Sequence, residues 1–183
     1  AGEIANMYEA GDDNQNSANI IKLIIDIGAS CSIDKKCIAN RGAAVAALVD
    51  EIESTGKRCE IWTVENAQGS GSKTNVLHSL VCAKQSGEAL DIDRVAFVIG
   101  HPSMLRRVLF SVLEVSPFAD DSGYDVSYGR SIALRPEVIP NDSIYITLMK
   151  GNDGYRTPAD AMKSIRKIYN NEASAKGLME VSL

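Results

Sequence analysis

The sequence contains few of the residues that build common metal sites. Its 183 residues include two histidines and four cysteines. Cys31, Cys37, Cys59 and Cys82 show neither CxxC spacing nor histidines nearby, which argues against a structural zinc site. Cys59 and Cys82 lie inside apolar runs, where a free cysteine behaves as a small hydrophobic residue. We therefore expect reduced cysteines in a cytoplasmic protein.

Long apolar runs are also absent. The longest, 20–27 and 105–115, contain charged residues and are too short to span a bilayer. The first residues lack the basic start, apolar middle and small-residue cleavage site of a signal peptide. Both observations predict a protein without a membrane anchor. Because residue 1 is alanine, we expect the native chain to begin further upstream.

Positive charge is in short supply. The chain has 19 lysines and arginines against 24 aspartates and glutamates, a net charge of −5. This balance disfavours a domain that grips duplex DNA by counterion release. The charge is uneven, however, because basic residues outnumber acidic ones within 150–176. A partner that carries phosphates would therefore meet the second half of the chain.

Hydrophobic periodicity divides the chain into alternating strands and helices. Strands are predicted at 20–27, 58–65, 75–83 and 143–150. Helices are predicted to begin at Asn40, at Asp91 or Asp93, after His101-Pro102, and at Thr157-Pro158. The strands at 58–65 and 75–83 are separated by a Gly/Ser loop, which is typical of an antiparallel hairpin.

The resulting order, β-α-β-β-α-α-β-α, predicts an α/β fold with a three-layer, Rossmann-like mixed sheet and one antiparallel hairpin strand. We expect a flexible lead-in at 1–19, a single domain at 20–176 and a C-terminal tail at 177–183. Function in such sheets concentrates in the loops that follow the carboxyl ends of the strands. These loops are expected at 26–41, 116–142 and 151–157.

The run Leu23-Ile24-Ile25-Asp26-Ile27-Gly28-Ala29-Ser30, followed by a helix and by Cys59-Glu60-Ile61-Trp62-Thr63-Val64, resembles a von Willebrand factor A domain over roughly residues 20–170. The first strand of that family ends in an Asp-x-Ser-x-Ser motif that helps to bind a divalent cation. Asp26 and Ser30 match two of its three positions. The resemblance thus implies a metal site at Asp26 and Ser30, with Ser32 or Asp34 as a third ligand. Gly28 replaces the first serine, so Asp26 could instead order the loop by hydrogen bonds alone.

A second resemblance is to uncharacterised phage proteins. It is carried by Asn40-Arg41-Gly42-Ala43 and by the segment His101-Pro102-Ser103-Met104-Leu105-Arg106-Arg107. These proteins are similar to a branch from podoviruses with a large virion RNA polymerase, which includes a single-stranded-DNA-binding transcription cofactor. The resemblance implies a phage protein in the cytoplasm of the infected host cell, with single-stranded DNA and the phage RNA polymerase as partners.

Signals for enzyme chemistry are weak. No nucleophile–histidine pair, histidine–carboxylate cluster or dinucleotide fingerprint is present. The stretch Gly69-Ser70-Gly71-Ser72-Lys73-Thr74 is not a phosphate loop, because serine precedes the lysine and a strand follows. We therefore expect a non-enzymatic protein.

Binding of single-stranded nucleic acid requires cations along the backbone and aromatic side chains for stacking. The chain offers both, although a basic stripe on a helix is often only a solvated face. The predicted phosphate contacts and stacking residues are Lys35, Lys36, Arg41, Arg106, Arg107, Tyr124, Tyr128, Arg130, Lys163, Arg166 and Lys167.

The alternative is a protein–protein interaction module of a phage complex. Such a domain would dock its partner through the loops at the strand ends, with or without a metal. The sheet edge near 75–83 could also mediate self-association into an oligomer. Salt separates the two functions, because binding to single strands weakens steeply as salt rises, whereas an apolar protein interface is less sensitive.

Overall fold

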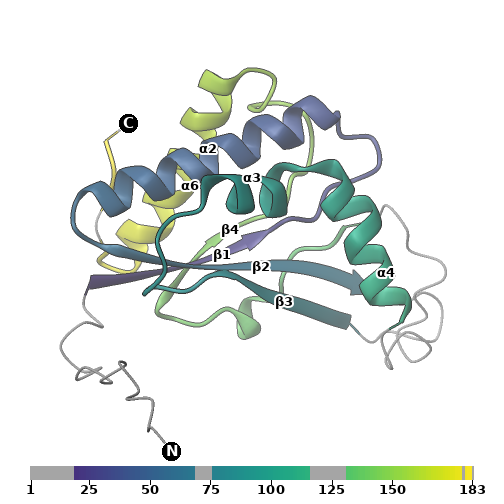
Figure 1. The fold of residues 1–183 in the computed structure, drawn as a ribbon, viewed down its shortest axis with the longest axis horizontal. Coiled ribbons are helices and arrows are strands. Elements are labelled where there is room, and N and C mark those ends of the chain that lie inside the picture. Colours follow the sequence, from purple (N-terminus) through teal and green to yellow (C-terminus); the bar gives the residue numbers. More distant parts are fainter. Residues whose placement is uncertain (1–18, 69–75, 116–130, 179, 183) are drawn as a thin grey trace, which may run out of the picture.

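A computed structural model describes residues 19–68, 76–115, 131–178 and 180–182 (Figure 1). Within these ranges, four strands form one sheet in the order β3-β2-β1-β4. Strand β1 (Ile20–Asp26) pairs in parallel with both β2 (Arg58–Gln68) and β4 (Ser143–Ile146), while β3 (Val76–Lys84) pairs antiparallel with β2. The predicted α/β class, the mixed sheet and its antiparallel hairpin strand are confirmed.

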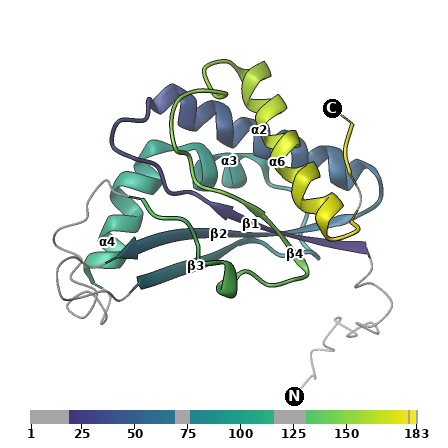
Figure 2. The same ribbon diagram turned by 180° about the vertical axis from the view of Figure 1, so that it is seen from behind.

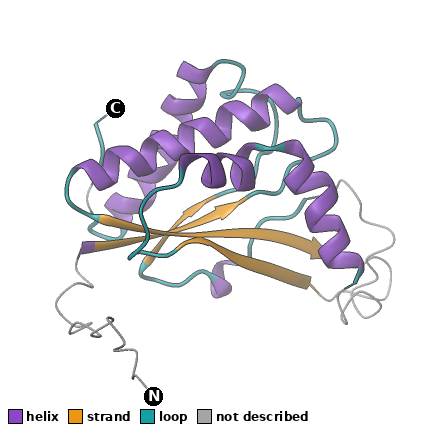
Figure 3. Cartoon of the chain, in the orientation of Figure 1, coloured by secondary structure: helices purple, strands orange, loops and turns teal. Residues whose placement is uncertain are grey.

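Helices α2 (Lys35–Ser54), α3 (Ile92–Gly100) and α6 (Pro158–Ala175) all cover the same face of the sheet (Figures 1 and 2). The opposite face carries segment 131–142, which includes the 3-10 turn η4 (Pro136–Val138; Figure 3). Leu134 and Ile139 of this segment pack in one apolar cluster with Ile24 and Tyr145 of the sheet. The sheet is therefore the middle of three layers, and an irregular segment forms the third.

Strand β1 lies at the centre of the core, as its nearly continuous apolar sequence predicts. Leu23 and Ile25 are fully buried on the helical side, in one cluster with Val45 and Leu48 of α2. Ile24 points to the other face and is also buried. Each such side chain contributes about 1.5–3 kcal/mol to stability by leaving water.

The first helix begins earlier than predicted. We expected Asn40 to cap it, but α2 starts at Lys35, and the Asp34 carboxylate accepts a hydrogen bond of 2.7 Å from the backbone N–H of Lys36. The Asn40 side chain instead donates to the Tyr155 carbonyl at 2.8 Å. The small residues of this region suggested a loop, yet Cys37 and Ile38 are buried in the core and form the inner face of the first turn.

Helix α2 touches α3 at a pair of glycines. A Cβ atom built on Gly42 would lie 2.3 Å from the Gly100 Cα atom, which is closer than real Cβ atoms approach other atoms. Gly42 therefore permits the two backbones to meet, despite the usual cost of glycine in a helix. This contact positions α3 over the β3 side of the sheet (Figure 1).

Other predicted boundaries agree in part. The break at His101-Pro102 is confirmed, since α3 ends at Gly100 and a π-helical turn, η2 (Met104–Val108), leads into α4 (Leu109–Glu114). The helix start at Thr157 is also confirmed, because its hydroxyl accepts from the Asp160 N–H at 3.1 Å. Strand β4 ends at Ile146 instead of residue 150, because its neighbour β1 already ends at Asp26. None of the helices within the described ranges combines the length and apolarity that crossing a bilayer requires.

Candidate functional site

Asp26 ends β1 and lies fully buried at the carboxyl edge of the sheet. Its Oδ1 accepts a hydrogen bond of 3.0 Å from the Gly28 N–H, and its Oδ2 accepts from Asn66 Nδ2 at 2.8 Å and from the Tyr145 hydroxyl at 2.7 Å. Parallel strands end at a common edge, which brings residues of β1, β2 and β4 together. Burial raises the pKa of Asp26, and the hydrogen bonds from Tyr145 and Gly28 oppose this effect.

Glu65 is a second buried carboxyl group next to this network. Only 6% of the residue is exposed, and its Oε2 atom has no hydrogen-bond partner among the described residues. Burial, followed by the negative charge of Asp26, raises the pKa of Glu65 to about 8. At neutral pH the Glu65 carboxyl group is therefore mostly protonated and uncharged.

Gly28 separates the two carboxyl groups. A Cβ atom at this position would lie 2.9 Å from Asp26 Oδ1, 3.0 Å from the Ser131 Cβ atom and 3.3 Å from Glu65 Oε2. Because a side chain at residue 28 would displace its neighbours, the chain cannot carry the first serine of the Asp-x-Ser-x-Ser motif in this arrangement. The Gly28 backbone N–H, which a side chain does not hinder, donates to Asp26 Oδ1.

A chain of hydrogen bonds extends from Asp26 to β3. The Asn66 amide nitrogen donates to Asp26, so the Asn66 Oδ1 atom is left to accept from His78 Nδ1, which lies 2.6 Å away. In this network His78 carries its proton on Nδ1. At the other end, the Leu134 N–H donates to the Tyr145 hydroxyl at 3.0 Å and fixes segment 131–142 to the network.

Arg41 occupies the helical side of the same edge. Its Nη2 atom donates to the carbonyl oxygens of Asp26 and Thr147, each at 2.8 Å, and the residue is 2% exposed. We predicted that Arg41 contacts phosphate. That prediction needs correction, because the guanidinium group is enclosed and holds the ends of β1 and β4 together instead.

A group of exposed lysines and arginines lies near the carboxyl ends of β1 and β4, outside the buried network around Asp26. We call Lys35, Lys36, Arg107, Lys150 and Arg156 the basic rim. Lys35 and Lys36 belong to the first turn of α2, where the helix dipole adds positive potential. Among the described residues only Arg156 of the rim forms an ion pair, with Asp153 at 3.2 Å, and both of these side chains are largely exposed. The other rim cations thus form no ion pair within the described part of the chain, and the carboxylates of Asp34 and Asp153 lie in the same loops.

Direct contacts hold the segments of the basic rim together. The Asp34 N–H donates to Asn152 Oδ1 at 2.9 Å, which joins the loop before α2 to the loop after β4. Arg106 Nη2 donates to the Ile33 carbonyl at 2.9 Å, which joins η2 to the first of these loops. Arg106 is thus engaged with backbone, and its neighbour Arg107 is exposed.

A family model described as a domain of unknown function, DUF7192, matches residues 1–173. The chain belongs to the DUF7192 family. No curated protein matches the chain, and no solved structure does either.

The remaining residues of this DUF7192 domain that the sequence predicts as DNA contacts differ in how exposed they are. Lys163 and Lys167 are exposed on α6, and the hydrogen bond from Ser164 Oγ to the Gly154 carbonyl places their helix beside the rim. Arg166 forms a half-buried ion pair with Glu51, at 2.8 Å, and is less available to a ligand. Tyr124, Tyr128 and Arg130 lie outside the described residues.

The predicted metal ligands are engaged in hydrogen bonds within the protein. Asp26 Oδ1 and Oδ2 accept three hydrogen bonds from the protein, while the Ser30 hydroxyl lies 3.1 Å from that of Ser32. Within the described ranges, no group of three histidine, cysteine, aspartate or glutamate residues is placed to hold a metal ion. Of the two explanations for Asp26, its contacts favour the ordering of the loop.

Sequence reasoning did not single out Glu65, Asn66, His78 and Tyr145. The available signal was the presence of acidic and amide groups at the end of an apolar strand, since Glu65 and Asn66 follow directly on Val64. Their convergence on Asp26 depends on the register of the strands, which pairs Asp26 with Val64 and Asn66 with His78.

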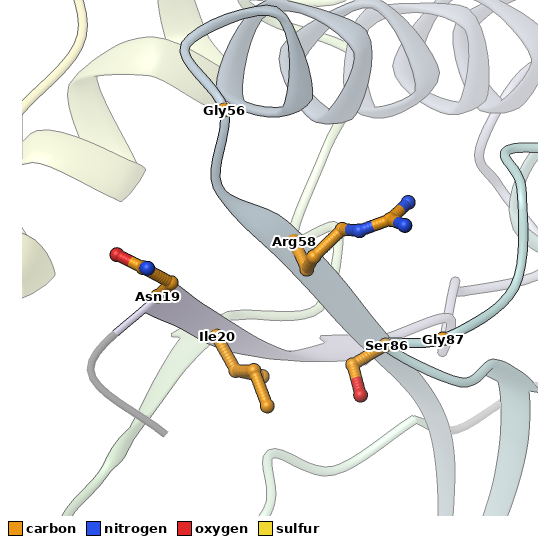
Figure 4. A pocket seen from close by; sticks show the side chains of 6 residues that line it. All are labelled: Asn19, Ile20, Gly56, Arg58, Ser86 and Gly87. Carbon is orange, nitrogen blue, oxygen red and sulfur yellow. The ribbon is translucent and has the colours of Figure 1, made fainter. Parts of the chain in front are cut away.

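A pocket of about 300 Å³ lies at the other end of the strands, where β1 and β2 begin (Figure 4). It is lined by Asn19, Ile20, Gly56, Arg58, Ser86 and Gly87. Arg58 is exposed and has no ion pair within the described part of the chain. It is thus a cation comparable to those of the basic rim, but on the far side of the domain.

Proposed function

We propose that the basic rim binds the phosphate backbone of single-stranded DNA without strong sequence preference. The observation that carries the proposal is that exposed cations from three separate segments, 35–36, 106–107 and 150–156, border one edge of the sheet. Phosphate contacts of this kind fix a strand in place without reading its bases. The exposed Lys163 and Lys167 of α6 extend the positive surface.

In this proposal the bases stack on Tyr124 and Tyr128 of the 116–142 loop, as the sequence predicts. The protein is non-enzymatic and acts in phage transcription or replication, in the cytoplasm of the infected host cell and alongside the phage RNA polymerase. This biological setting rests on the resemblance to the phage proteins and on the von Willebrand A-like order of elements. The DNA-binding part rests on the rim and can be tested separately.

The test measures fluorescence anisotropy of labelled single-stranded and duplex oligonucleotides over a range of salt concentrations. The full chain is compared with Lys35→Glu/Lys36→Glu. The acidic replacements suit the first turn of a helix, so α2 is retained. Loss of two phosphate contacts lowers the slope of log affinity against log salt by about 1.4. We expect affinity for single strands to fall at least about tenfold.

The matched control is Lys57→Glu/Arg58→Glu, which makes the same charge change beside the pocket at the other end of the strands (Figure 4). We expect this variant to retain most of its affinity. An equal loss in the control would show that net charge, or the Arg58 pocket, accounts for binding. Absence of salt-dependent binding by the unmodified chain would refute the proposal.

A protein–protein interaction module is the second candidate. It is favoured by Ile92 and Phe97 of α3, which are 56% and 45% exposed. Association through such apolar groups should change little with salt. The immobilised chain can be used to capture a partner from an extract of phage-infected cells at high salt. Capture of a partner, together with no affinity for DNA, would favour this function over the first.

A further inference from the structure

An apolar groove lies between the outer faces of α2 and α3. The two helices lie side by side, and Gly42 brings the backbone of α2 against Gly100 of α3 (Figure 1). The groove has a volume of about 330 Å³. Four of the residues that line it are small, namely Ala39, Ala43, Ala96 and Gly100. Because these residues are short, they leave open apolar space between the helices.

A stacked aromatic pair also lines this groove. The ring centroids of Phe97 and His101, which are one helical turn apart, are separated by 5.1 Å, and the ring planes are inclined by 25°. His101 Nδ1 accepts a hydrogen bond of 3.2 Å from the Ser103 N–H, which holds the imidazole ring in this position. Phe97 is 45% exposed, and His101 is exposed as well. The pair is therefore an aromatic surface of the kind on which nucleic-acid bases stack.

The groove adjoins the basic rim. Lys35, Ala39 and Ala43 are spaced four residues apart on α2, so they follow one face of the helix in steps of about 6 Å. Lys36 lies beside the same row, three residues before Ala39. Both lysines are exposed. A nucleotide whose phosphate contacts these lysines can therefore place its base in the groove.

The lining of the groove favours an uncharged ring over a phosphate group. Asp93 contributes a carboxylate, which repels phosphate but can accept a hydrogen bond from the exocyclic amino group of a base. The volume of the groove lies at the lower end of the range for small-molecule sites, which suits a single ring system. Apolar small residues, an aromatic pair and one acceptor together match the chemistry of a nucleobase.

We propose that this groove receives one base of the single-stranded DNA held by the basic rim, with the base stacked on Phe97 and His101. The inference rests on the proposed function and adds a stacking site to it, because the rim supplies only phosphate contacts. Stacking tolerates differences in sequence, since every base has an aromatic face. It also favours single strands over duplex DNA, whose bases are paired and stacked on one another.

The experiment is a thermodynamic cycle between Phe97 and the bases of the ligand. Fluorescence anisotropy at low salt compares the full chain with Phe97→Ala on a labelled strand of cytosine nucleotides and on an abasic strand of the same length. The abasic strand retains its phosphates, so it measures the contacts of the rim alone. We expect Phe97→Ala to weaken binding of the cytosine strand at least about fivefold. Binding of the abasic strand should change by less than about twofold.

Ile92→Ala is the matched control. Ile92 belongs to the same helix and is 56% exposed, but it is not among the residues that line the groove. We expect this variant to bind both strands like the unmodified chain. Circular dichroism of each variant shows whether α3 is retained.

The outcomes separate this inference from the proposed function. A folded Phe97→Ala variant that retains its affinity for the cytosine strand, or that loses affinity equally for both strands, would overturn the inference and leave the rim as the DNA site. The slope of log affinity against log salt should be the same for Phe97→Ala and the unmodified chain, because no phosphate contact is lost. Absence of salt-dependent binding by the unmodified chain would refute the proposed function, and the inference with it.

Discussion

Replacing Glu65 with glutamine tests the buried pair of carboxyl groups at the strand ends. The residue is 6% exposed, its Oε2 atom has no hydrogen-bond partner in the described part of the chain, and its pKa is raised from 4.5 to about 8. In the unfolded chain the same carboxyl group ionises near its ordinary pKa. Between these two values the folded protein binds a proton that the unfolded chain releases, so the free energy of unfolding falls as pH rises.

The magnitude follows from the shift. Each pKa unit corresponds to about 1.4 kcal/mol, so Glu65 can reduce the free energy of unfolding by roughly 5 kcal/mol between pH 4.5 and pH 8. This is comparable to the entire stability of many small domains, which is about 5–15 kcal/mol. Glutamine has the shape of the protonated acid and does not ionise. We therefore expect Glu65→Gln to lie within about 1 kcal/mol of the unmodified protein at pH 5 and to exceed it by several kcal/mol at pH 8.

Urea unfolding measured at intervals from pH 5 to pH 9 gives both pH profiles. The pKa of Asp26 is also raised, which leaves a smaller slope of the same sign in the variant. Glu180→Gln, a change at an exposed position, should retain the full slope. A flat profile for the unmodified protein, or equal slopes for it and Glu65→Gln, would show that Glu65 ionises normally and that the reasoning from its burial is wrong.

Two further changes probe the supports of the site. Gly42→Ala should destabilise the fold by about 1–3 kcal/mol or more, because the new Cβ atom meets the Gly100 backbone at 2.3 Å and 2.7 Å. Gly87→Ala, whose Cβ atom meets nothing within 4 Å, serves as its control in the same thermal unfolding assay. Arg41→Lys should cost about 2–3 kcal/mol, because an ammonium group cannot reproduce the contacts of the guanidinium group with two strand ends. Because Arg41 is buried, the variant should retain its DNA affinity in anisotropy at temperatures where it is folded, and a selective loss of affinity would contradict the assigned role.

Local patterns were sufficient to predict most of the fold. The apolar run of β1 indicated a strand buried on both faces, and Thr157-Pro158 marked the start of α6. The start of α2 was misplaced, because the small and polar residues around Asp34 are typical of a loop. The cap at Asp34 and the buried Cys37 and Ile38 become evident only when the core that they contact is known.

The site was less predictable than the fold, because its polar groups come from separate strands. Asp26 drew attention through a motif, but its partners Asn66 and Tyr145 lie 40 and 119 residues away. No local pattern specifies that these side chains share one face of the sheet at the same edge. Arg41 was assigned to the surface, because it is a basic residue near a loop expected to be functional. Its guanidinium group is buried, and this burial depends on three-dimensional packing that the local sequence does not specify.

The uncharged state of Glu65 also bears on how the basic rim could act. Asp26 and Arg41 lie on either side of the end of β1, where burial raises the pKa of the Asp26 carboxyl group and lowers the pKa of the Arg41 guanidinium group. With Glu65 protonated, its carboxyl group adds no negative charge to oppose the field of the nearby lysines and arginines. An ionised Glu65 would add an unpaired negative charge in a poorly screened interior, where its influence on a bound phosphate is greater than in water. The same burial that makes the fold sensitive to alkali therefore leaves the edge of the sheet positive at neutral pH.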